Sequence, residues 1–239
     1  MEGAPEGPCG ILLVDKPRGP TSHDVVDAVR RLYRTRRVGH AGTLDPMATG
    51  LLIVMVGRAT KASDRLMAED KAYEAELTLG VVTDSQDAEG KVLETNPVPP
   101  LDLAAVRAAV EAMVGDRLQT PPMHSARKVG GVALHKLARQ GKEVAREARP
   151  IRVHSAELLS WESPRLAFRV RCTKGTYVRT LGHELGRALG PGGHLTALRR
   201  TASGRLDVGR AHTLEALGAL DEAGLAARLI RVEEALADA

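Results

Sequence analysis

RLAFRVRCTKGTYVRTLGHELGRALG, residues 165–190, is the stretch of this sequence that most clearly indicates a fold class. Its first eight positions set apolar residues mostly against arginines, which predicts a strand with one apolar and one cationic face. Apolar residues then recur at helical spacing from Val178 to Leu189, so we predict a helix that stops at Gly190. Further patterns typical of strands and of helices occur on both sides of residues 165–190.

Two further strands are indicated on the N-terminal side. KAYEAELTLGV, residues 71–81, alternates with Tyr73 on its apolar face, as a half-buried antiparallel strand does. ILLVDKP, residues 11–17, is almost continuously apolar and ends in proline, which predicts a buried strand. Helical spacing follows directly from Ser22 to Tyr33, so the chain is expected to open with strand, turn and helix.

The other segments mix helices with loops. LDLAAVRAAVEAMVG, residues 101–115, predicts a helix with Asp102 as N-cap and Gly115 just past its end; Leu103, Val106, Val110 and Met113 form its apolar stripe. Short amphipathic helices are expected over 213–239. GHAGTLDPMATG, residues 39–50, is rich in glycine and predicts a loop that feeds a short strand. Because alternating strands are mixed with helices, we predict an α+β fold with a mixed, largely antiparallel central sheet flanked by helices.

The composition excludes several classes of protein. The 239 residues are 43% hydrophobic, which is enough for a packed core and excludes disorder throughout. One Phe, one Trp and three Tyr are too few for a surface that stacks several bases on exposed rings. Two cysteines exclude a disulfide framework and suit a reducing compartment. With no signal-peptide pattern and no long apolar run, we expect a cytoplasmic protein with no membrane association.

The charge distribution fits a polyanionic partner without requiring one. There are 34 Lys and Arg against 30 Asp and Glu, for a net charge of +4. Residues 121–150 are basic, are bounded by prolines and offer a core little beyond a short helix from Leu134 to Gln140. We interpret this segment as a basic surface excursion.

Asp45 is the candidate for chemistry in the 39–50 loop, where it precedes Pro46 and follows His40 by five residues. From residue types alone two interpretations stay open: a carboxylate that caps a turn, or one that acts on a substrate. The histidines lack metal-ligand spacing, and no glycine cluster has nucleotide-binding spacing, so no metal and no nucleotide cofactor is expected. The chemistry left is that of a single nucleophilic or basic aspartate.

Several motifs occur in an order that resembles a known family. They are GILLVDKPRGPTS (10–22), GHAGTLDPMATGLL (39–52), ATK (59–61), DKAYEAELTLG (70–80), PPMHSARKVGG (121–131), CTKGTYVRTL (172–181) and LRR (198–200). Their order and intervals are similar to those of the bacterial tRNA pseudouridine synthase B family, TruB, from about Gly10 to Val232.

The resemblance implies a pseudouridine-synthase fold and an isomerase. It implies one catalytic domain over 1–239, with a thumb-like RNA-binding insertion at 121–150, C-terminal helices at 213–239 and no C-terminal PUA module. The implied activity is conversion of uridine 55 in the T loop of tRNA to pseudouridine by base flipping, with no cofactor. The expected partner is the T arm of tRNA, with no obligate protein partner and a monomeric chain.

The resemblance also implies roles for individual residues. Asp45 is the essential carboxylate, either a nucleophile or the base of a glycal route, and the sequence leaves both open. Arg179 is implied to pair with Asp45, and Tyr73 is implied to stack on the flipped uracil and to take part in catalysis by proton transfer. His40 would fill the space that the base leaves in the T loop. The other implied substrate-binding residues are Tyr177 and Leu198, which line the uracil pocket, and Lys16 and Lys61, with structural or phosphate contacts.

Two positions depart from the family pattern, since His124 and His135 stand where tyrosine is usual. Both lie in the insertion, so stacking on RNA there is expected to be weaker or sensitive to pH. Two other functions stay open from the sequence: a noncatalytic factor that remodels tRNA, and an RNA glycosidase that releases free uracil. The presence of Asp45 together with Arg179 argues against a purely binding role.

Overall fold

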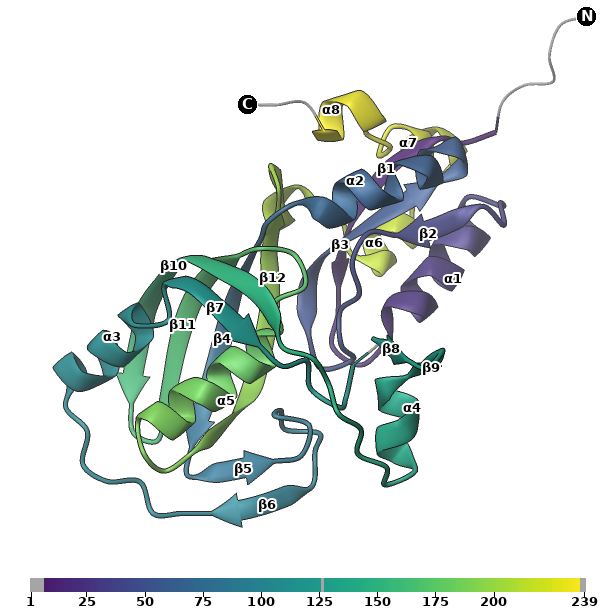
Figure 1. Cartoon of the computed structure of the whole chain (residues 1–239). Coiled ribbons are helices and arrows are strands. Elements are labelled where there is room, and N and C mark those ends of the chain that lie inside the picture. The colour runs from purple at the N-terminus through teal and green to yellow at the C-terminus, as the bar shows by residue number, and fades with distance from the viewer. Residues whose placement is uncertain (1–6, 126, 237–239) are drawn as a thin grey trace, which may run out of the picture. The chain divides into compact units, whose positions relative to one another are not determined.

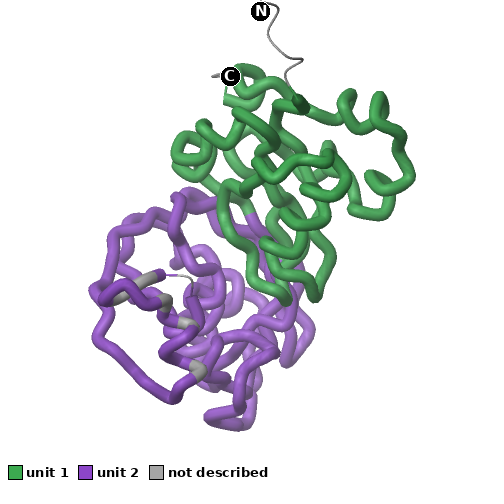
Figure 2. The backbone as a smooth tube through the Cα atoms, turned by 90° about the vertical axis from the view of Figure 1, so that its right-hand side faces the viewer, with its two compact units in different colours: residues 1–72, 199–239 green, residues 73–198 purple. Residues whose placement is uncertain are grey.

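The computed structural model describes residues 7–125 and 127–236, leaving aside the side chains of residues 128, 129, 133, 135 and 139. The predicted α+β class is confirmed: a nine-stranded, mostly antiparallel sheet is accompanied by helices. Its backbone divides into two compact units, residues 1–72 with 199–239 and residues 73–198, which Figure 2 distinguishes by colour. We refer to them as unit 1 and unit 2.

Unit 1 is built around a strand pair close to the N-terminus (Figure 1). Its elements are β1 (Gly10–Lys16), α1 (Ser22–Leu32), β2 (Val38–His40), β3 (Thr49–Val56), η1 (Gly57–Ala62), α2 (Ser63–Ala68), β13 (Leu206–Asp207), η2 (Val208–Arg210), α6 (Leu214–Gly218), α7 (Glu222–Ala226) and α8 (Val232–Leu236). β3 pairs antiparallel with β1 and with β2. The predicted opening of strand, turn and helix is therefore confirmed.

The core of unit 1 lies between these strands and the C-terminal segments. β1 and β3 are almost wholly buried, and Ile11, Leu13 and Ile53 pack with the partly buried Val232 and Leu236 of α8. Gly50 is required where β3 meets the end of β12, because it has φ +94° and a Cβ there would lie 2.3 Å from the Arg200 carbonyl oxygen. Backbones thus approach closely at the point where the loop 41–48 joins β3.

Unit 2 contains the rest of the sheet in the order β12, β4, β11, β10, β7. Its elements are β4 (Lys71–Leu79), β5 (Val81–Thr83), β6 (Val92–Thr95), α3 (Leu103–Glu111), β7 (Gly115–Gln119), β8 (Lys128–Val129), β9 (Val132–Ala133), α4 (Leu134–Arg139), β10 (Arg149–Glu162), β11 (Arg165–Cys172), α5 (Val178–Ala188) and β12 (Gly193–Ser203). The first two residues of β4 and the last five of β12 belong to unit 1.

The alternating strands of unit 2 are confirmed in detail. β4 buries Tyr73, Ala75, Leu77 and Leu79. β11 buries Leu166, Phe168, Val170 and Cys172, while its arginines are exposed. α5 lies against this part of the sheet in Figure 1, and its buried residues include Val178, Leu181 and Leu185. It packs so closely that a Cβ on Gly182 would lie 2.6 Å from Leu195 of β12, so this helix position has no room for a side chain.

Three details of the fold differ from the predictions. Two are strand boundaries, set by pairing with a neighbouring strand, and one is the exposure of a helix residue. His40 lies in β2 rather than in the predicted loop, since this short strand pairs with β3. Leu103, predicted for the buried stripe of α3, is 52% exposed because only Val106 and Val110 of that helix are buried. Gly115 begins β7 instead of ending the helix.

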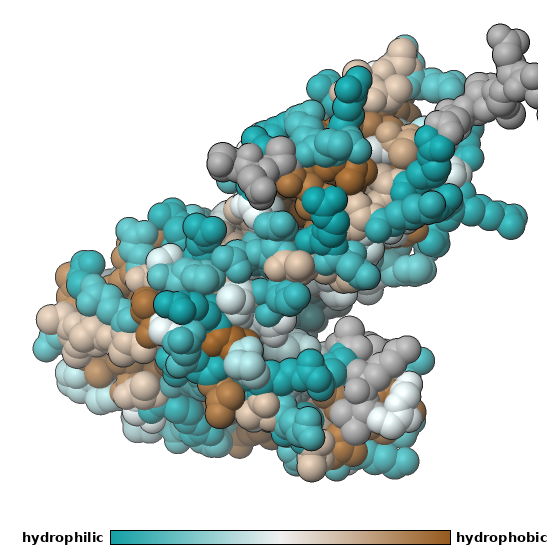
Figure 3. Space-filling view, turned by 45° about the horizontal axis from the view of Figure 1, so that its top comes forward, coloured by the Kyte–Doolittle hydropathy of each residue, from teal (hydrophilic) through white to brown (hydrophobic). Residues whose placement is uncertain are grey.

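On the face drawn in Figure 3, hydrophilic residues predominate and hydrophobic ones form small separate groups.

Candidate functional site

Asp45 lies in unit 1 in the loop 41–48, between β2 and β3. Its side chain is half-buried, and its backbone carbonyl accepts a hydrogen bond from the Ala48 amide at 3.1 Å. The carboxylate is therefore carried by a tight turn with Pro46 at its second position, a residue whose fixed φ suits such a turn. A turn of this kind holds the side chain more precisely than an open loop would.

Lys16 holds the backbone of this turn through hydrogen bonds. Its side chain is fully buried at the end of β1, and its Nζ donates to the carbonyls of Ala48 (2.7 Å), Pro17 (2.9 Å) and Pro46 (3.3 Å). A buried ammonium with three donors is satisfied only if such acceptors stay in place. Lys16 therefore ties the residues that follow Asp45 to the end of β1.

Two further contacts hold the same loop. The buried hydroxyl of Ser22, in the first turn of α1, donates to the Leu44 carbonyl at 3.0 Å and accepts from the Leu44 amide at 2.8 Å. Arg200, which is also buried, donates from Nε to the Leu51 carbonyl and from a terminal nitrogen to the Gly42 carbonyl. The loop is thus fixed from α1, β1 and β12 by hydrogen bonds to its backbone.

His40 and Arg199 add to the polar surroundings in unit 1. Burial, with smaller contributions from Arg200 and His23, lowers the pKa of His40, so its imidazole is neutral at pH 7. Its Nδ1 is buried and has no hydrogen-bond partner among the residues that the structure describes. Arg199 forms a bidentate ion pair with Asp15, with N–O distances of 3.0 and 2.8 Å.

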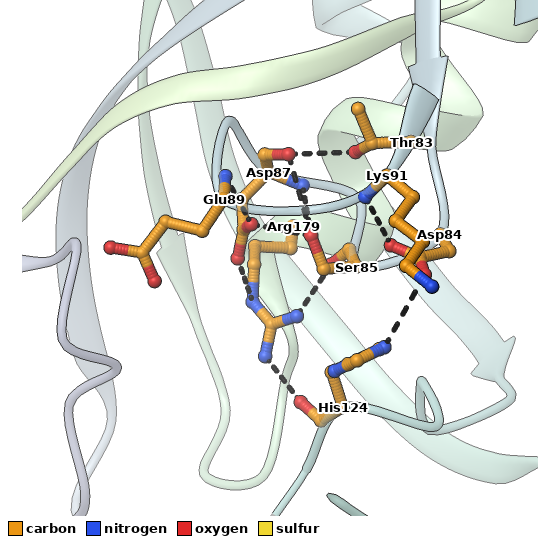
Figure 4. A network of polar contacts seen from close by, with 8 residues as sticks. All are labelled: Thr83, Asp84, Ser85, Asp87, Glu89, Lys91, His124 and Arg179. Atoms are coloured by element: carbon orange, nitrogen blue, oxygen red, sulfur yellow. Dashed lines mark hydrogen bonds and ion pairs between the residues drawn. The ribbon is translucent and has the colours of Figure 1, made fainter. Parts of the chain in front are cut away.

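Arg179 lies in unit 2, in the first turn of α5, and is buried in a polar network (Figure 4). Its two terminal nitrogens donate to the carbonyls of Ser85 (2.6 Å) and His124 (2.7 Å), and its Nε lies 3.6 Å from Oδ2 of Asp87. The guanidinium is thereby held in one orientation by two separate loops and one carboxylate.

The loop 83–91 wraps around Asp87 (Figure 4). Asp87 Oδ1 accepts from the Ser85 hydroxyl and from the Glu89 amide, and the Asp87 carbonyl accepts from Thr83. Asp84 accepts from the Lys91 amide and closes the loop at its ends. The Asp87 carboxylate that faces Arg179 is therefore itself oriented by its own loop.

Tyr177 is the N-cap residue of α5 and is fixed through its backbone. Gln119 at the end of β7 accepts from the Tyr177 amide at 2.7 Å and donates to the Tyr177 carbonyl at 3.1 Å. Tyr73 is buried on β4, and Leu198 is buried on β12. Tyr177, Tyr73 and Leu198 all belong to unit 2, as Arg179 does.

The predicted site residues are thus distributed over both units. Asp45, His40, Lys16 and Lys61 belong to unit 1, where Lys61 is exposed on η1 and Lys16 is buried beneath the loop. The pairing of Asp45 with Arg179 stays a prediction, as do the individual roles of these residues.

Sequence reasoning missed Asp87, Gln119 and Arg200. The turn residues in TDSQDAEGK (83–91) indicate a loop, but nothing in the spacing singles out Asp87. Gln119 is a polar residue at the end of a strand, and its burial follows only from the position of α5. The importance of these three residues becomes visible only in the structure, where they contact segments that are distant in the sequence.

The insertion at 121–150 contains β8, β9, α4 and the first residues of β10. His124 lies near its start, with Nε2 3.9 Å from Oδ2 of Asp84 and its carbonyl bound to Arg179. The backbone of His135 belongs to α4, and its side chain lies outside the described residues. Within residues 7–125 and 127–236, no cluster of His, Cys, Asp and Glu suited to a metal ion occurs, and no helix is long and apolar enough to span a bilayer.

Two family descriptions match the chain along nearly its whole length. Residues 30–178 match "TruB family pseudouridylate synthase (N terminal domain)", and residues 179–237 match "tRNA pseudouridylate synthase B C-terminal domain". The chain is 56% identical over 226 residues to tRNA pseudouridine synthase B of Opitutus terrae, which covers 95% of this chain and 94% of that protein. It is 50% identical to the protein of that name from Syntrophotalea carbinolica, over 95% of this chain and 74% of the relative.

Among solved structures, the chain is similar to one in the crystal structure of a Cbf5-Nop10-Gar1 complex. The TM-score is 0.74 and the sequence identity is 29%, over 95% of this chain and 61% of that chain. The chain therefore spans less than two thirds of that larger protein.

Proposed function

The chain belongs to the TruB family of pseudouridylate synthases, and from this premise we propose that it isomerises uridine 55 in the T loop of tRNA to pseudouridine. The observation that carries the proposal is the 56% identity to a tRNA pseudouridine synthase B over 95% of the chain. The reaction breaks the bond between N1 of uracil and C1′ of the ribose, turns the base and joins C5 to C1′. It changes neither the atoms nor the oxidation state of the nucleoside, so it requires no cofactor.

In this proposal Asp45 supplies the carboxylate. Two routes balance. In one, the carboxylate attacks C1′ as the bond to N1 breaks, and C5 of the turned uracil then displaces the carboxylate from C1′. In the other, the carboxylate removes the C2′ proton as uracil leaves to give a glycal, and returns that proton to C2′ as C5 joins C1′. In both, uracil loses the proton on C5 and gains one at N1, so the product is an isomer of the substrate. Both need a carboxylate held in place beneath the sugar. The contacts from Lys16 and Ser22 to the loop 41–48 support this role, because they hold the backbone on both sides of Asp45.

The other predicted residues take supporting roles. Arg179 stabilises the Asp45 carboxylate, Tyr73 stacks on the flipped uracil, and Tyr177 with Leu198 lines the pocket. His40, neutral at pH 7 and with Nδ1 buried, occupies the space that the base vacates. Lys61 is exposed and suits a phosphate contact. Lys16 is buried against backbone carbonyls, which favours a structural role over a phosphate contact. Extraction of the uridine costs a few kcal/mol of unstacking, which contacts of the basic insertion with the RNA backbone offset.

We further propose that the T arm is the recognised part of tRNA, and that the insertion closes over it. The chain acts as a monomer in the cytoplasm, with residues 1–239 as one catalytic domain and with no obligate protein partner. A T-arm hairpin alone is therefore a substrate.

The test is chemical mapping of pseudouridine in a T-arm hairpin incubated with the protein in a buffer that contains a chelator. Wild-type protein converts the target uridine, whereas Asp45→Asn forms no pseudouridine and binds the hairpin with a Kd within about twofold of wild type. Asp64→Asn, the same change at an exposed position of α2, keeps full turnover.

Other outcomes identify the rival functions. Release of free uracil would indicate a glycosidase, and refolding of tRNA without any pseudouridine would indicate a binding factor. Unchanged turnover by Asp45→Asn would refute the assignment of the carboxylate.

A further inference from the structure

The first turn of α5 lacks a cap of its own. Its N-cap residue, Tyr177, makes no side-chain hydrogen bond to the helix, although the N-terminal turn of a helix exposes several unpaired amide groups. Helix ends of this kind fray unless another part of the fold holds them. This turn carries Tyr177 and Arg179, two residues of the predicted site.

Gln119 supplies the missing support from β7. Its side chain is buried, with 3% of the residue exposed, and both of its amide atoms are used on one residue. The Tyr177 amide donates to Oε1 at 2.7 Å, and Nε2 donates to the Tyr177 carbonyl at 3.1 Å. A side chain that pairs with both backbone groups of one residue fixes the position and the direction of the chain there.

The same segment also reaches Arg179. We call residues 119–124, which lead from β7 into the insertion, the insertion root. Gln119 lies at its start and holds Tyr177, and His124 lies at its end, where its carbonyl accepts from Arg179 at 2.7 Å. The insertion root therefore contacts the first turn of α5 at two points that lie two residues apart along the helix.

We propose that Gln119 is a positioning residue for the isomerisation: it fixes the first turn of α5 so that Tyr177 and Arg179 hold the geometry that the flipped uridine requires. Gln119 acts through their backbone and does not touch the substrate. The proposal rests on the function proposed above. Since small displacements of positioned groups reduce rates strongly, loss of Gln119 affects the chemical step more than RNA binding.

The experiment compares Gln119→Leu with wild type in single-turnover kinetics on the T-arm hairpin at saturating protein. We expect the rate of pseudouridine formation to fall roughly ten- to a hundredfold, while the hairpin Kd changes by less than about threefold. Leu118→Ala, at the adjacent position of β7 where the side chain is 71% exposed, leaves both quantities unchanged. A wild-type rate for Gln119→Leu in the folded protein would overturn the proposal.

Loss of stability is separated from loss of position by a second variant. Val110→Ala creates a cavity under α3 and lowers the unfolding temperature, while Gln119, Tyr177 and Arg179 keep their side chains. At a temperature where both variants are folded, we expect Val110→Ala to keep the wild-type rate. An equal loss of rate in Val110→Ala would show that Gln119 acts only through stability and would overturn the proposal.

The pH dependence of the rate of Gln119→Glu tests positioning separately, because a residue that only stabilises the fold would not change this dependence. Its carboxylate still accepts from the Tyr177 amide but cannot donate to the Tyr177 carbonyl, whereas its protonated form does both. We therefore expect the rate of this variant relative to wild type to rise as the pH is lowered from about 8 to about 5.5. If the rate of Gln119→Glu divided by the wild-type rate is below 1 and does not change with pH, the role of the donated hydrogen bond is contradicted.

Hydrogen exchange tests the positioning without any turnover. The Tyr177 amide of Gln119→Leu exchanges at least about tenfold faster than in wild type, because its acceptor is gone, and Gln119→Glu retains protection. If wild-type protein forms no pseudouridine, the proposed function fails while this measurement still decides whether Gln119 holds the turn. Unchanged exchange in Gln119→Leu would overturn the proposal even in an active enzyme.

Discussion

The Nε atom of Arg179 lies 3.6 Å from Oδ2 of Asp87, and the two side chains are only 3% and 7% exposed. The guanidinium also donates to the carbonyls of Ser85 and His124, so one buried cation joins the loop 83–91 to the insertion root. In such surroundings a charge without its partner is costly. The Asp87 carboxylate therefore helps to hold the buried Arg179 in this orientation.

Asp87→Asn removes that negative charge and preserves the shape of the side chain. We expect the free energy of unfolding to fall by about 2–4 kcal/mol, because the buried Arg179 cation loses the carboxylate that lies beside its Nε. Pseudouridine formation falls with it, since the guanidinium is reoriented. Urea unfolding and single-turnover kinetics measure the two effects.

The matched control for Asp87→Asn is Asp84→Asn in the same loop. Asp84 is partly exposed, and an asparagine can still accept from the Lys91 amide. Its effect on unfolding is expected to stay below about 1 kcal/mol. Equal losses for the two variants would mean that the charge of Asp87 has no special importance.

The exposed lysines of the insertion are expected to contact RNA phosphates. Lys136 on α4 and Lys142 after it are both exposed. Their double replacement by alanine reduces the slope of log K against log salt concentration by about 2, since each phosphate contact contributes about 1. Filter binding of the T-arm hairpin at several salt concentrations measures the slope. Arg107→Ala, on the exposed face of α3, serves as the control, and an unaltered slope for the double variant would place the RNA elsewhere.

Stability is expected to decrease in acid, in part through His183 of α5. Burial, and secondly the nearby Arg187, lower the pKa of His183 below its usual 6.5, while Glu94 opposes this. As the pH falls through 6.5, the unfolded chain binds a proton on this imidazole before the folded chain does, so the free energy of unfolding decreases.

His183→Gln removes that titration and makes the pH dependence of stability shallower below pH 6.5. Urea unfolding at neutral pH and at about pH 5 gives the difference. A steeper dependence in His183→Gln would show that the sign is wrong.

Tyr33, at the C-cap of α1, is expected to stabilise unit 1 through one hydrogen bond. Its hydroxyl donates to the Leu225 carbonyl of α7 at 2.8 Å, and burial raises the pKa of Tyr33 to about 12. Tyr33→Phe removes this hydrogen bond from a carbonyl that still accepts from the Arg228 amide, and lowers the free energy of unfolding by about 1 kcal/mol. Thermal and urea unfolding measure the change; full stability of the variant would indicate that water replaces the hydroxyl.

Local patterns predicted the individual elements well where one face is buried. β4 and β11 alternate in burial as their sequences do, and the buried stripe of α1 contains Val25, Val26 and Val29. The short β2 and the hairpin of β5 with β6 were not predicted. Strands of three or four residues carry too little pattern, and their existence depends on a partner strand.

The sequence by itself determined the α+β class, the main strands and helices, and, through its ordered motifs, the family and the candidate Asp45. Only the tertiary structure decided that Lys16 holds the loop of Asp45, that Asp87 faces Arg179, and that Gln119 supports Tyr177. The physical reason is distance along the chain. Periodicity and turn chemistry act between neighbouring residues, whereas a buried lysine, carboxylate or amide finds its partner 30 to 94 residues away, after the strands have paired.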